Sequence, residues 1–218
     1  MNLYVVTEGK VESIVYRHWI PFVNPHISQA LTLNEIDNNK FYLISGMGYP
    51  YYLNIIADAI LDVNNIRKFD RLVISIDSED MTRQEKYDEI KVFISNKPCT
   101  AEVRIVVQHF CFETWALGNR RVIRPKPVSS KLREYKHFFD VRNRDPELLP
   151  HKPDESLNRA QFAERYLRLA LNDKFRNLTY TKNNPQAVMH NKYFDQVKNR
   201  FHDTGHIASF DDFLQAFI

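Results

Sequence analysis

The sequence predicts an α/β fold, with a mostly parallel four-stranded sheet and a helical C-terminal extension. Short apolar runs alternate with helical patterns over the first hundred residues. The runs are apolar almost throughout, which is typical of parallel strands covered on both faces. After Arg120 this alternation stops, and basic and amphipathic helical segments follow. We therefore expect a core over 1–120 and a basic, mainly helical extension over 121–218.

The predicted strands are each followed by a polar or glycine-containing segment. They lie at 3–6, 41–44, 71–76 and 103–107. Helices are expected at 10–19, 53–61, 83–95, 157–171 and 210–217, with a further helix starting near 111, and Pro21 is expected to end the first of them. Right-handed crossovers place the carboxyl ends of parallel strands along one edge, where open α/β sheets bind ligands.

Composition favours an ordinary globular protein. Of the 218 residues, 44% are hydrophobic and 26% are charged. No apolar run approaches the roughly 20 residues that span a bilayer, and the N-terminus lacks signal-peptide features. Cys99 and Cys111 have no CxxC spacing, which indicates a reducing compartment and neither a disulfide framework nor a zinc site. We expect a cytoplasmic protein with no membrane partner.

The net charge of +3 is unevenly distributed along the chain. Residues 1–112 hold 11 Lys/Arg and 14 Asp/Glu, and residues 113–218 hold 19 and 13, so the two parts carry −3 and +6. An acidic first part and a basic second part would suit a metal site and a grip on phosphate. Two ordinary solvated surfaces would give the same distribution.

Glu8 and Glu12 follow the first predicted strand. Glu12 lies four residues after Glu8, in the first turn of the expected helix, so both carboxylates could face one crevice. The helix dipole also favours an acid at this position. The alternative for Glu12 is a surface acid of the first turn.

Asp77 and Glu79 follow the third predicted strand, in the sequence Asp-Ser-Glu-Asp. In an extended segment, alternate side chains point to one side, so these carboxylates are expected to lie together. A cation would relieve their repulsion, and hard oxygen ligands select Mg²⁺ or Mn²⁺. Asp80 is expected to cap the following helix.

These motifs resemble the TOPRIM fold. The segment 4–12, YVVTEGKVE, resembles the opening motif of its nuclease branch, and 73–79, VISIDSE, resembles its Asp-x-Asp motif with Glu79 where Asp is usual. The segment 108–115, QHFCFETW, is similar to a third acidic motif. In size and pattern the chain resembles the small stand-alone TOPRIM-like proteins of bacterial antiphage defence loci, which are related to the overcoming-lysogenisation-defect nucleases. The resemblance covers roughly 1–120 and implies a Rossmann-like core.

The resemblance also implies roles for individual residues. Glu8 would be a metal ligand or general acid/base, and Glu12 the second glutamate of the nuclease branch. Asp77 and Glu79 would bind the metal, and Glu113 would serve a second metal or positioning. A lysine late in the chain commonly assists such nucleases, and Lys182 and Lys192 are the candidates.

Arg120 to Arg144 contains nine Lys/Arg and two acids, with Tyr135, Phe138 and Phe139 among them. Cations neutralise phosphates and aromatic rings stack on unpaired bases, so the stretch could bind nucleic acid. The residues expected to contact phosphates are Lys10, Arg120, Arg121, Arg124 and Lys126. A solvated linker or a partner-binding strip is the alternative.

Together these features predict an Mg²⁺- or Mn²⁺-dependent nuclease acting on DNA or structured RNA such as tRNA, as an antiphage effector. An ATPase partner protein is implied by related systems, and a homo-oligomer stays open. The alternative is a non-catalytic TOPRIM-like module that binds nucleic acid or a partner protein. Primase or topoisomerase work is disfavoured, because the chain lacks room for the extra domains.

Overall fold

One five-stranded parallel sheet organises the first part of the chain in the computed structural model, which describes residues 1–48, 50–175 and 178–218. The strand order is β2-β3-β1-β4-β5. The strands are β1 (Leu3–Thr7), β2 (Ser28–Ala30), β3 (Lys40–Ser45), β4 (Arg71–Asp77) and β5 (Glu102–Gln108). Thr7 pairs with Ser45 on one side and with Ser75 on the other, so β1, β3 and β4 run parallel in matched register. The predicted α/β fold with a parallel sheet is confirmed.

The predicted strand number of four was wrong, because the sequence gives no signal for β2. This strand has only three residues, Ser-Gln-Ala, and pairs with β3 alone at the edge of the sheet. Two of its three side chains are polar and at least partly exposed, so no apolar run marks it.

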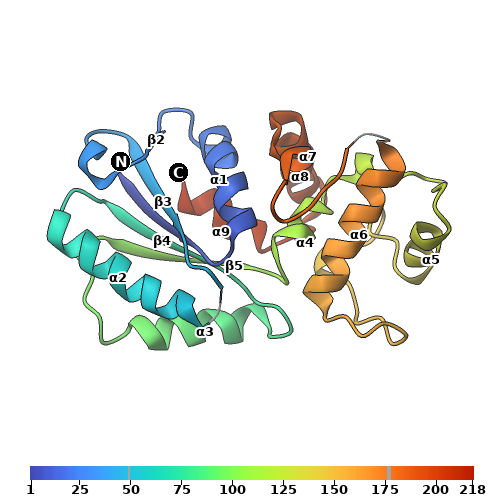
Figure 1. The fold of residues 1–218 in the computed structure, drawn as a ribbon, viewed down its shortest axis with the longest axis horizontal. Coiled ribbons are helices and arrows are strands. Elements are labelled where there is room, and N and C mark those ends of the chain that lie inside the picture. The colour runs from blue at the N-terminus through green and yellow to red at the C-terminus, as the bar shows by residue number, and fades with distance from the viewer. Residues whose placement is uncertain (49, 176–177) are drawn as a thin grey trace. The chain divides into compact units, whose positions relative to one another are not determined.

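Helices cover both faces of this sheet (Figure 1). The α2 helix (Tyr51–Ile66) and α3 helix (Arg83–Ile94) pack on one face, in a core that includes Tyr4, Leu72 and Ile90. The α1 helix (Lys10–Val23) and the end of α9 (Phe210–Ala216) lie on the other face, where the ring of Tyr16 contacts that of Phe213.

Pro21 does not end the first helix, which continues to Val23. A proline removes one N–H donor and restricts the residue before it. Pro21 lies in the last turn of α1, where only two further residues follow before the C-cap, Asn24. The N–H of Asn24 still donates to the carbonyl of Ile20 at 2.9 Å, so the final turn closes around the proline.

The chain divides into two compact units. Unit 1 comprises 1–76, 83–107 and 212–218, and unit 2 comprises 77–82 and 108–211. This division differs from the predicted boundary at residue 120 for two reasons. The α4 helix (Phe112–Ala116) packs on α6 (Arg159–Lys174), and the C-terminal residues return to the sheet of unit 1, where Arg71 donates to the carbonyl of Ala216 at 2.7 Å.

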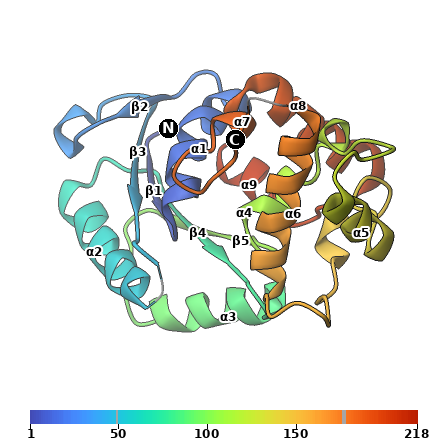
Figure 2. The ribbon, with the colours of Figure 1, turned by 45° about the vertical axis from the view of Figure 1, so that its right-hand side comes forward.

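Unit 2 consists mainly of helices and contains the last residue of β4 and of β5. Within it, α6 lies beside both α4 and α5 (Figure 2). Its other helices are α5 (Ser130–Phe138), α7 (Gln186–Met189) and α8 (Asn191–Thr204). The rings of Tyr135, Phe162 and Tyr166 pack against one another between α5 and α6. No helix in the described part of the chain is both long and apolar enough to cross a membrane.

Candidate active site

Glu8 lies directly after β1, and its main chain is held by the neighbouring strand ends of unit 1. Its N–H donates to the carbonyl of Ser75 at 3.0 Å, and its carbonyl accepts from the N–H of Gly48 at 3.0 Å. The side chain is half-buried. These two bonds fix the Glu8 backbone at the carboxyl edge of the sheet, where the sequence predicted it.

Glu12 is buried, with 3% of its surface exposed, which excludes the alternative of a surface acid. It occupies the first turn of α1, and its carboxylate lies over Gly9: a Cβ atom on Gly9 would stand 2.6 Å from Oε2 of Glu12. The helix N-terminus favours a carboxylate in this position. Lys10, at the start of the same helix, is exposed.

The loop after β3 supports the position of Glu8. Gly46 donates its N–H to the carbonyl of Thr7 at 2.7 Å, and a Cβ at Gly46 would meet the ring of Tyr52 at 2.1 Å. The hydroxyl of Tyr52 donates to the carbonyl of Ser75 at 2.8 Å. Glycine is therefore required here because the Tyr52 ring lies directly on the main chain.

Asp77 and Glu79 do not alternate along an extended segment, as the sequence suggested. Glu79 has a positive φ of 48°, in the left-handed region, and the N–H of Met81 donates to the carbonyl of Ser78 at 2.9 Å. The chain thus turns immediately after Ser78. Asp77 is half-buried at the end of β4, while Glu79 is exposed. The turn also leaves Asp80 exposed in contact with Arg159, with an oxygen–nitrogen distance of 3.5 Å.

Neighbours in unit 2 hold the turn and the Asp77 carboxylate. The side-chain amide of Gln108 donates to Oδ1 of Asp77 at 3.0 Å. The hydroxyl of Ser78 shares a 2.7 Å hydrogen bond with Nδ1 of His109. The N–H of Glu79 donates to the carbonyl of Phe110 at 2.9 Å. His109 is therefore a hydrogen-bonded support of the turn.

Glu113 lies in the first turn of α4, with 1% of its surface exposed. Its Oε1 accepts a 2.8 Å hydrogen bond from the hydroxyl of Tyr180. Cys111 is also buried, and its thiol pKa is raised well above the usual value, first by burial and then by the nearby carboxylates of Glu113 and Asp77. The thiol is therefore protonated at neutral pH and unreactive.

Lys182 lies near the same acids. Desolvation of its ammonium group acts to lower the pKa, but the nearby Glu113, Cys111, Asp77 and Glu164 raise it, and the net shift is upward. Its Nζ lies 3.9 Å from a carboxylate oxygen of Glu164, and 55% of its side chain is exposed. Lys182 is thus a permanent cation at neutral pH. The other lysine candidate, Lys192, is exposed at the start of α8.

Unit 2 therefore brings together three residues that the sequence singled out, Asp77, Glu113 and Lys182. Together with Cys111 and Tyr180 we call them the unit 2 cluster. Nothing in the sequence indicated that Tyr180 belongs to this cluster, because it lies 67 residues from Glu113, whose carboxylate it contacts. Glu8 and Glu12 belong to unit 1. Within the ranges that the structure describes, no three His, Cys, Asp or Glu side chains are grouped so as to hold a metal ion.

Most of the basic stretch 120–144 serves the structure of unit 2. Arg124 pairs with Asp173, with Nε 3.4 Å from Oδ2. Arg142 donates to the carbonyl of Ile123 at 3.0 Å. The guanidinium of Arg144 stacks on the ring of Phe139, 4.0 Å from the ring centroid. Its aromatic residues are not available to bases, since Tyr135 and Phe139 are buried and Phe138 packs on Phe162. The expectation of base stacking by this stretch was wrong because these rings form the core between α5 and α6.

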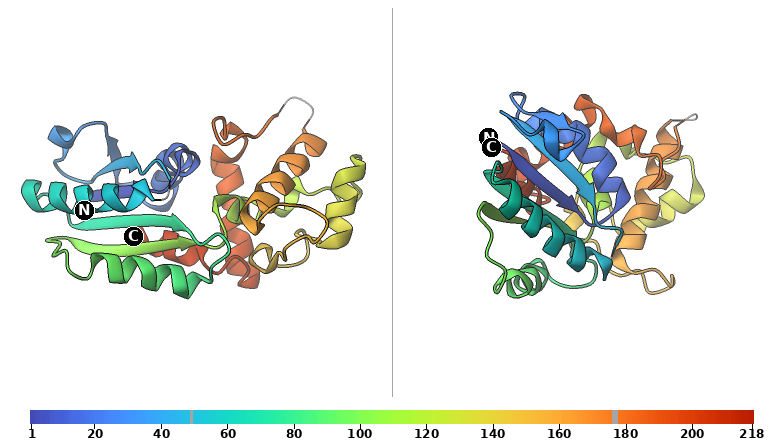
Figure 3. Two further views of the ribbon diagram at one scale, coloured as in Figure 1. Left: turned by 60° about the horizontal axis from the view of Figure 1, so that its bottom comes forward. Right: turned by 60° about the vertical axis from the view of Figure 1, so that its left-hand side comes forward.

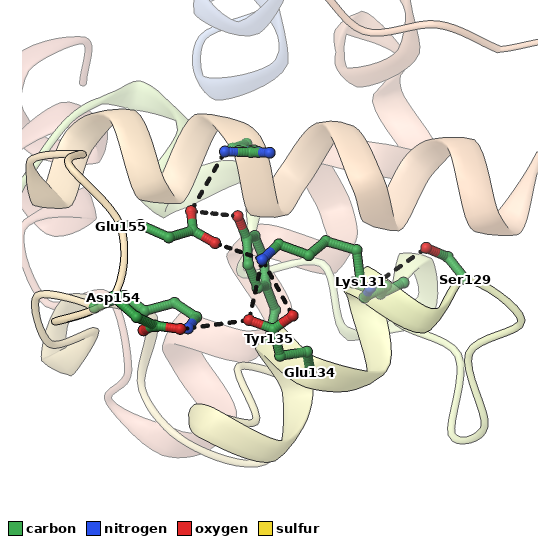
Figure 4. A network of polar contacts seen from close by, with 9 residues as sticks. Ser129, Lys131, Glu134, Tyr135, Asp154 and Glu155 are labelled. Atoms are coloured by element: carbon green, nitrogen blue, oxygen red, sulfur yellow. Dashed lines mark hydrogen bonds and ion pairs between the residues drawn. The ribbon is translucent and has the colours of Figure 1, made fainter.

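Carboxylates neutralise two lysines of unit 2, and Figure 4 shows Lys131 beside Glu134 and Glu155. The ammonium of Lys131 lies 3.0 Å from Glu134 and 2.7 Å from Glu155. Lys152, which is 4% exposed, lies 3.0 Å from Glu134 and also contacts Asp154. Carboxylates neutralise the charge of both lysines, which belong to an ion-pair network within unit 2.

Three further cations of the stretch border an open hollow of about 540 Å³ in unit 2. It is lined by Pro125, Lys126, Pro127, Arg133, Lys136, His137 and Asp140. Arg133 and Lys136 also donate to carbonyls of the loop 124–128, which fixes them at the rim. Lys126 is exposed, as is Arg121, whereas Arg120 is half-buried. Lys136 lies 3.8 Å from Asp140, so Lys126 and Arg133 give the hollow a net positive charge suited to phosphate.

Comparison of the chain with protein-family models, with curated proteins and with solved structures finds no match.

Proposed function

We propose that the chain is a metal-dependent nuclease that hydrolyses phosphodiester bonds in DNA or in structured RNA such as tRNA. The observation that carries the proposal is the unit 2 cluster, in which the carboxylates of Asp77 and Glu113 both act electrostatically on the ammonium of Lys182 and raise its pKa. Asp77 is the last residue of β4, and α/β folds bind ligands at the carboxyl ends of such strands. The resemblance of the motifs around Glu8 and Asp77 to TOPRIM nucleases supports the same activity and a role as an antiphage effector.

The metal would be Mg²⁺ or Mn²⁺, with Asp77 as a ligand in unit 2. Mg²⁺ keeps several waters and needs one or two carboxylates together with substrate phosphates, which a single half-buried aspartate can begin to supply. When bound, such an ion polarises the phosphate and activates a water molecule.

The other members of the cluster would position the substrate phosphate and neutralise its charge. Because its pKa is raised, Lys182 cannot act as a base at neutral pH; it would hold a phosphate oxygen and offset the charge of the leaving oxygen. Glu113 is buried and accepts from Tyr180, which fits a positioning role for the lysine rather than contact with substrate. The metal-ligand role of Glu8 and the role of Glu12 rest on the sequence motif.

The second candidate is a non-catalytic module that binds nucleic acid or a partner. Two observations favour it. No three potential ligands are grouped among the described residues, and Lys182 itself supplies positive charge beside Asp77 and Glu113. The basic hollow around Lys126 would serve either candidate.

Cleavage of two substrates under three metal conditions separates these candidates. The purified chain is incubated with supercoiled plasmid and with total tRNA, in Mg²⁺, in Mn²⁺ and in EDTA. We expect cleavage of one substrate with metal and none in EDTA. Asp77→Ala and Glu8→Ala should each lower the rate at least about a hundredfold, which corresponds to roughly 3 kcal/mol of barrier. Asp203→Ala, which changes an exposed acid of α8, is the matched control.

If neither substrate is cut in any condition, or if both Asp77→Ala and Glu8→Ala retain full activity, the nuclease proposal is wrong. Binding that persists in EDTA without cleavage would support the second candidate.

A further inference from the structure

The β5 strand is an edge of the sheet in unit 1. It follows β4 at the end of the strand order, and no other strand in the described part of the chain lies beyond it (Figure 3, left). An edge strand offers a row of main-chain donors and acceptors to another strand.

The direction of these groups follows from the pairing with β4. The N–H of Glu102 donates to the carbonyl of Asp70 at 3.0 Å. In a parallel pair, alternate residues bond to the same neighbour, so Glu102 and Arg104 bond towards β4 and Val103 and Ile105 direct their N–H and C=O groups away from it. The side chains of Val103 and Ile105 are half-buried and pack against the apolar core on the α2–α3 side. The β5 strand is thus held in place by β4 and by the core, while the N–H and C=O groups of Val103 and Ile105 point away from the sheet.

A groove runs along this part of the strand. It has a volume of about 220 Å³ and is lined by Tyr87 of α3, by Val103, Arg104 and Ile105, and by Asp212, Gln215 and Ala216 of α9. Residues 103–105 therefore line a surface hollow, with helices on either side of it.

The charged side chains of β5 are complementary to those of a second, antiparallel copy of the same strand. Glu102 and Arg104 are two residues apart, so they project from the same face of the strand, with 45% and 49% of their side chains exposed. Within one chain Arg104 lies 2.5 Å from Glu102, which also pairs with Arg71 at 2.9 Å, so a dimer would redistribute these ion pairs across the two strands. If a second copy of the strand pairs antiparallel about a two-fold axis at Val103, each Glu102 lies opposite Arg104 of the other copy. Shifting the axis to Glu102 or to Arg104 instead places identical charges opposite each other, which is destabilising.

In this register Val103 of one copy faces Val103 of the other as a hydrogen-bonded pair, because both direct their main-chain groups outwards. The Glu102–Arg104 pairs then fall at non-hydrogen-bonded positions, where opposite side chains are closest. Backbone direction and side-chain charge thus favour the same alignment.

We propose that β5 is a self-association surface, through which two copies of the chain join their sheets in an antiparallel, two-fold symmetric dimer. A closed two-fold interface uses the same patch on both copies, which a strand paired with itself satisfies. The interface is short, and small interfaces are typically weak and concentration-dependent. The proposal does not depend on nuclease activity.

Sedimentation velocity of the full chain over a concentration series up to about 100 μM, a range suited to weak complexes, tests this surface. We expect the mass to rise from 25.9 kDa towards twice that value. Val103→Pro should abolish the rise, because it removes the outward N–H, and it should still fold, since proline is tolerated where an edge N–H faces solvent. Far-ultraviolet circular dichroism checks the fold.

Charge reversal provides a second test that keeps the main chain intact. Glu102→Lys and Arg104→Glu should each be monomeric, because each places like charges opposite each other. An equimolar mixture of the two should regain the dimer, since every cross-strand pair becomes opposite again. Arg17→Glu, on the exposed side of α1, is the matched control and should behave like the wild type. A wild type that stays monomeric throughout the series, or a dimer that survives both Val103→Pro and the single charge reversals, would overturn the proposal.

Discussion

The hydroxyl of Tyr180 donates a 2.8 Å hydrogen bond to the buried carboxylate of Glu113, across 67 residues of sequence. A carboxylate that is 1% exposed needs such compensation, because an unpaired buried charge is costly. Tyr180 directly precedes a tight turn in which Thr181 and Asn184 exchange main-chain hydrogen bonds of 3.3 and 2.9 Å. Lys182 lies in that turn. The Tyr180–Glu113 bond therefore connects the turn that carries Lys182 to α4.

Tyr180→Phe tests this connection. The substitution keeps the buried ring and removes the donor to Glu113, so we expect the free energy of unfolding to fall by about 1–3 kcal/mol, the cost of leaving a buried group unsatisfied. Urea unfolding followed by fluorescence measures it. Tyr51→Phe, which alters an exposed tyrosine of α2, should change stability little. Equal stability of wild type and Tyr180→Phe would show that the bond does not hold the turn.

The sheet could be predicted largely from sequence because its strands are buried on both faces. Runs such as Leu72–Val73–Ile74, fully buried here, have no polar interruption and allow one interpretation. The exceptions have local causes. The edge strand β2 is short and polar, and Pro21 lies so near the end of α1 that the helix closes around it.

The candidate site was only partly predictable. Glu8 and Asp77 could be placed because each lies at the carboxyl end of an apolar strand, Glu8 directly after β1 and Asp77 as the last residue of β4. The exposed, left-handed Glu79 could not, since the turn depends on hydrogen bonds to residues near 110 that no local pattern records. The basic stretch was misjudged for a related reason. Its charges and rings are typical of nucleic-acid binding, but their partners, such as Asp173 and Phe162, lie far along the chain.

Gly46→Ala should destabilise unit 1. The new Cβ would stand 2.1 Å from the ring of Tyr52, which is fully buried and hydrogen-bonded to Ser75, so the ring has no free space to move into. Overpacking of this kind typically costs about 1–3 kcal/mol. Thermal unfolding should show a lower midpoint than wild type. If Gly46→Ala melts like wild type, the loop adjusts freely and does not fix the main chain of Glu8.

His206 predicts a pH dependence of stability. Its pKa is lowered from the usual 6.5, first by burial and then by Arg200, whose guanidinium lies 3.1 Å from Nδ1. The folded state therefore binds fewer protons than the unfolded state. The stability this provides is present above about pH 6.5 and is lost as the pH falls through that value towards the lower folded pKa.

Urea midpoints measured at pH 7 and pH 5 test this dependence. His206→Asn keeps an acceptor near Arg200 but cannot be protonated, so we expect it to lose less stability than the wild type on acidification. His26→Asn, at an exposed histidine of unit 1, is the control. Identical pH profiles for wild type and His206→Asn would contradict the assignment.

We expect the exposed cations Arg121 and Lys126 to contact the phosphates of nucleic acid, because Arg124 is already paired with Asp173. Replacing both with Ala should weaken binding and reduce the slope of log affinity against log salt by about one unit per lost phosphate contact. Fluorescence anisotropy with labelled DNA and RNA at several salt concentrations measures the slope. Lys91→Ala, at an exposed lysine of α3, should leave it unchanged. An unaltered slope in the double variant would favour a solvated or partner-binding role for the segment.

Asp77→Asn distinguishes a metal ligand from a structural carboxylate. Asparagine keeps an oxygen that can accept from Gln108, the partner of Asp77 at 3.0 Å, so the metal-free variant should be about as stable as the wild type. Removing the charge also ends the attraction between Asp77 and the ammonium of Lys182, so we expect no gain in stability over the wild type. With Mg²⁺ at ten times its dissociation constant, linkage should stabilise the wild type by about 1.4 kcal/mol, and the variant should gain much less. Thermal melts of both proteins, with and without Mg²⁺, measure all four values. If Asp77→Asn melts several degrees lower without metal and Mg²⁺ shifts neither protein, then Asp77 holds the end of β4 through Gln108 and binds no metal.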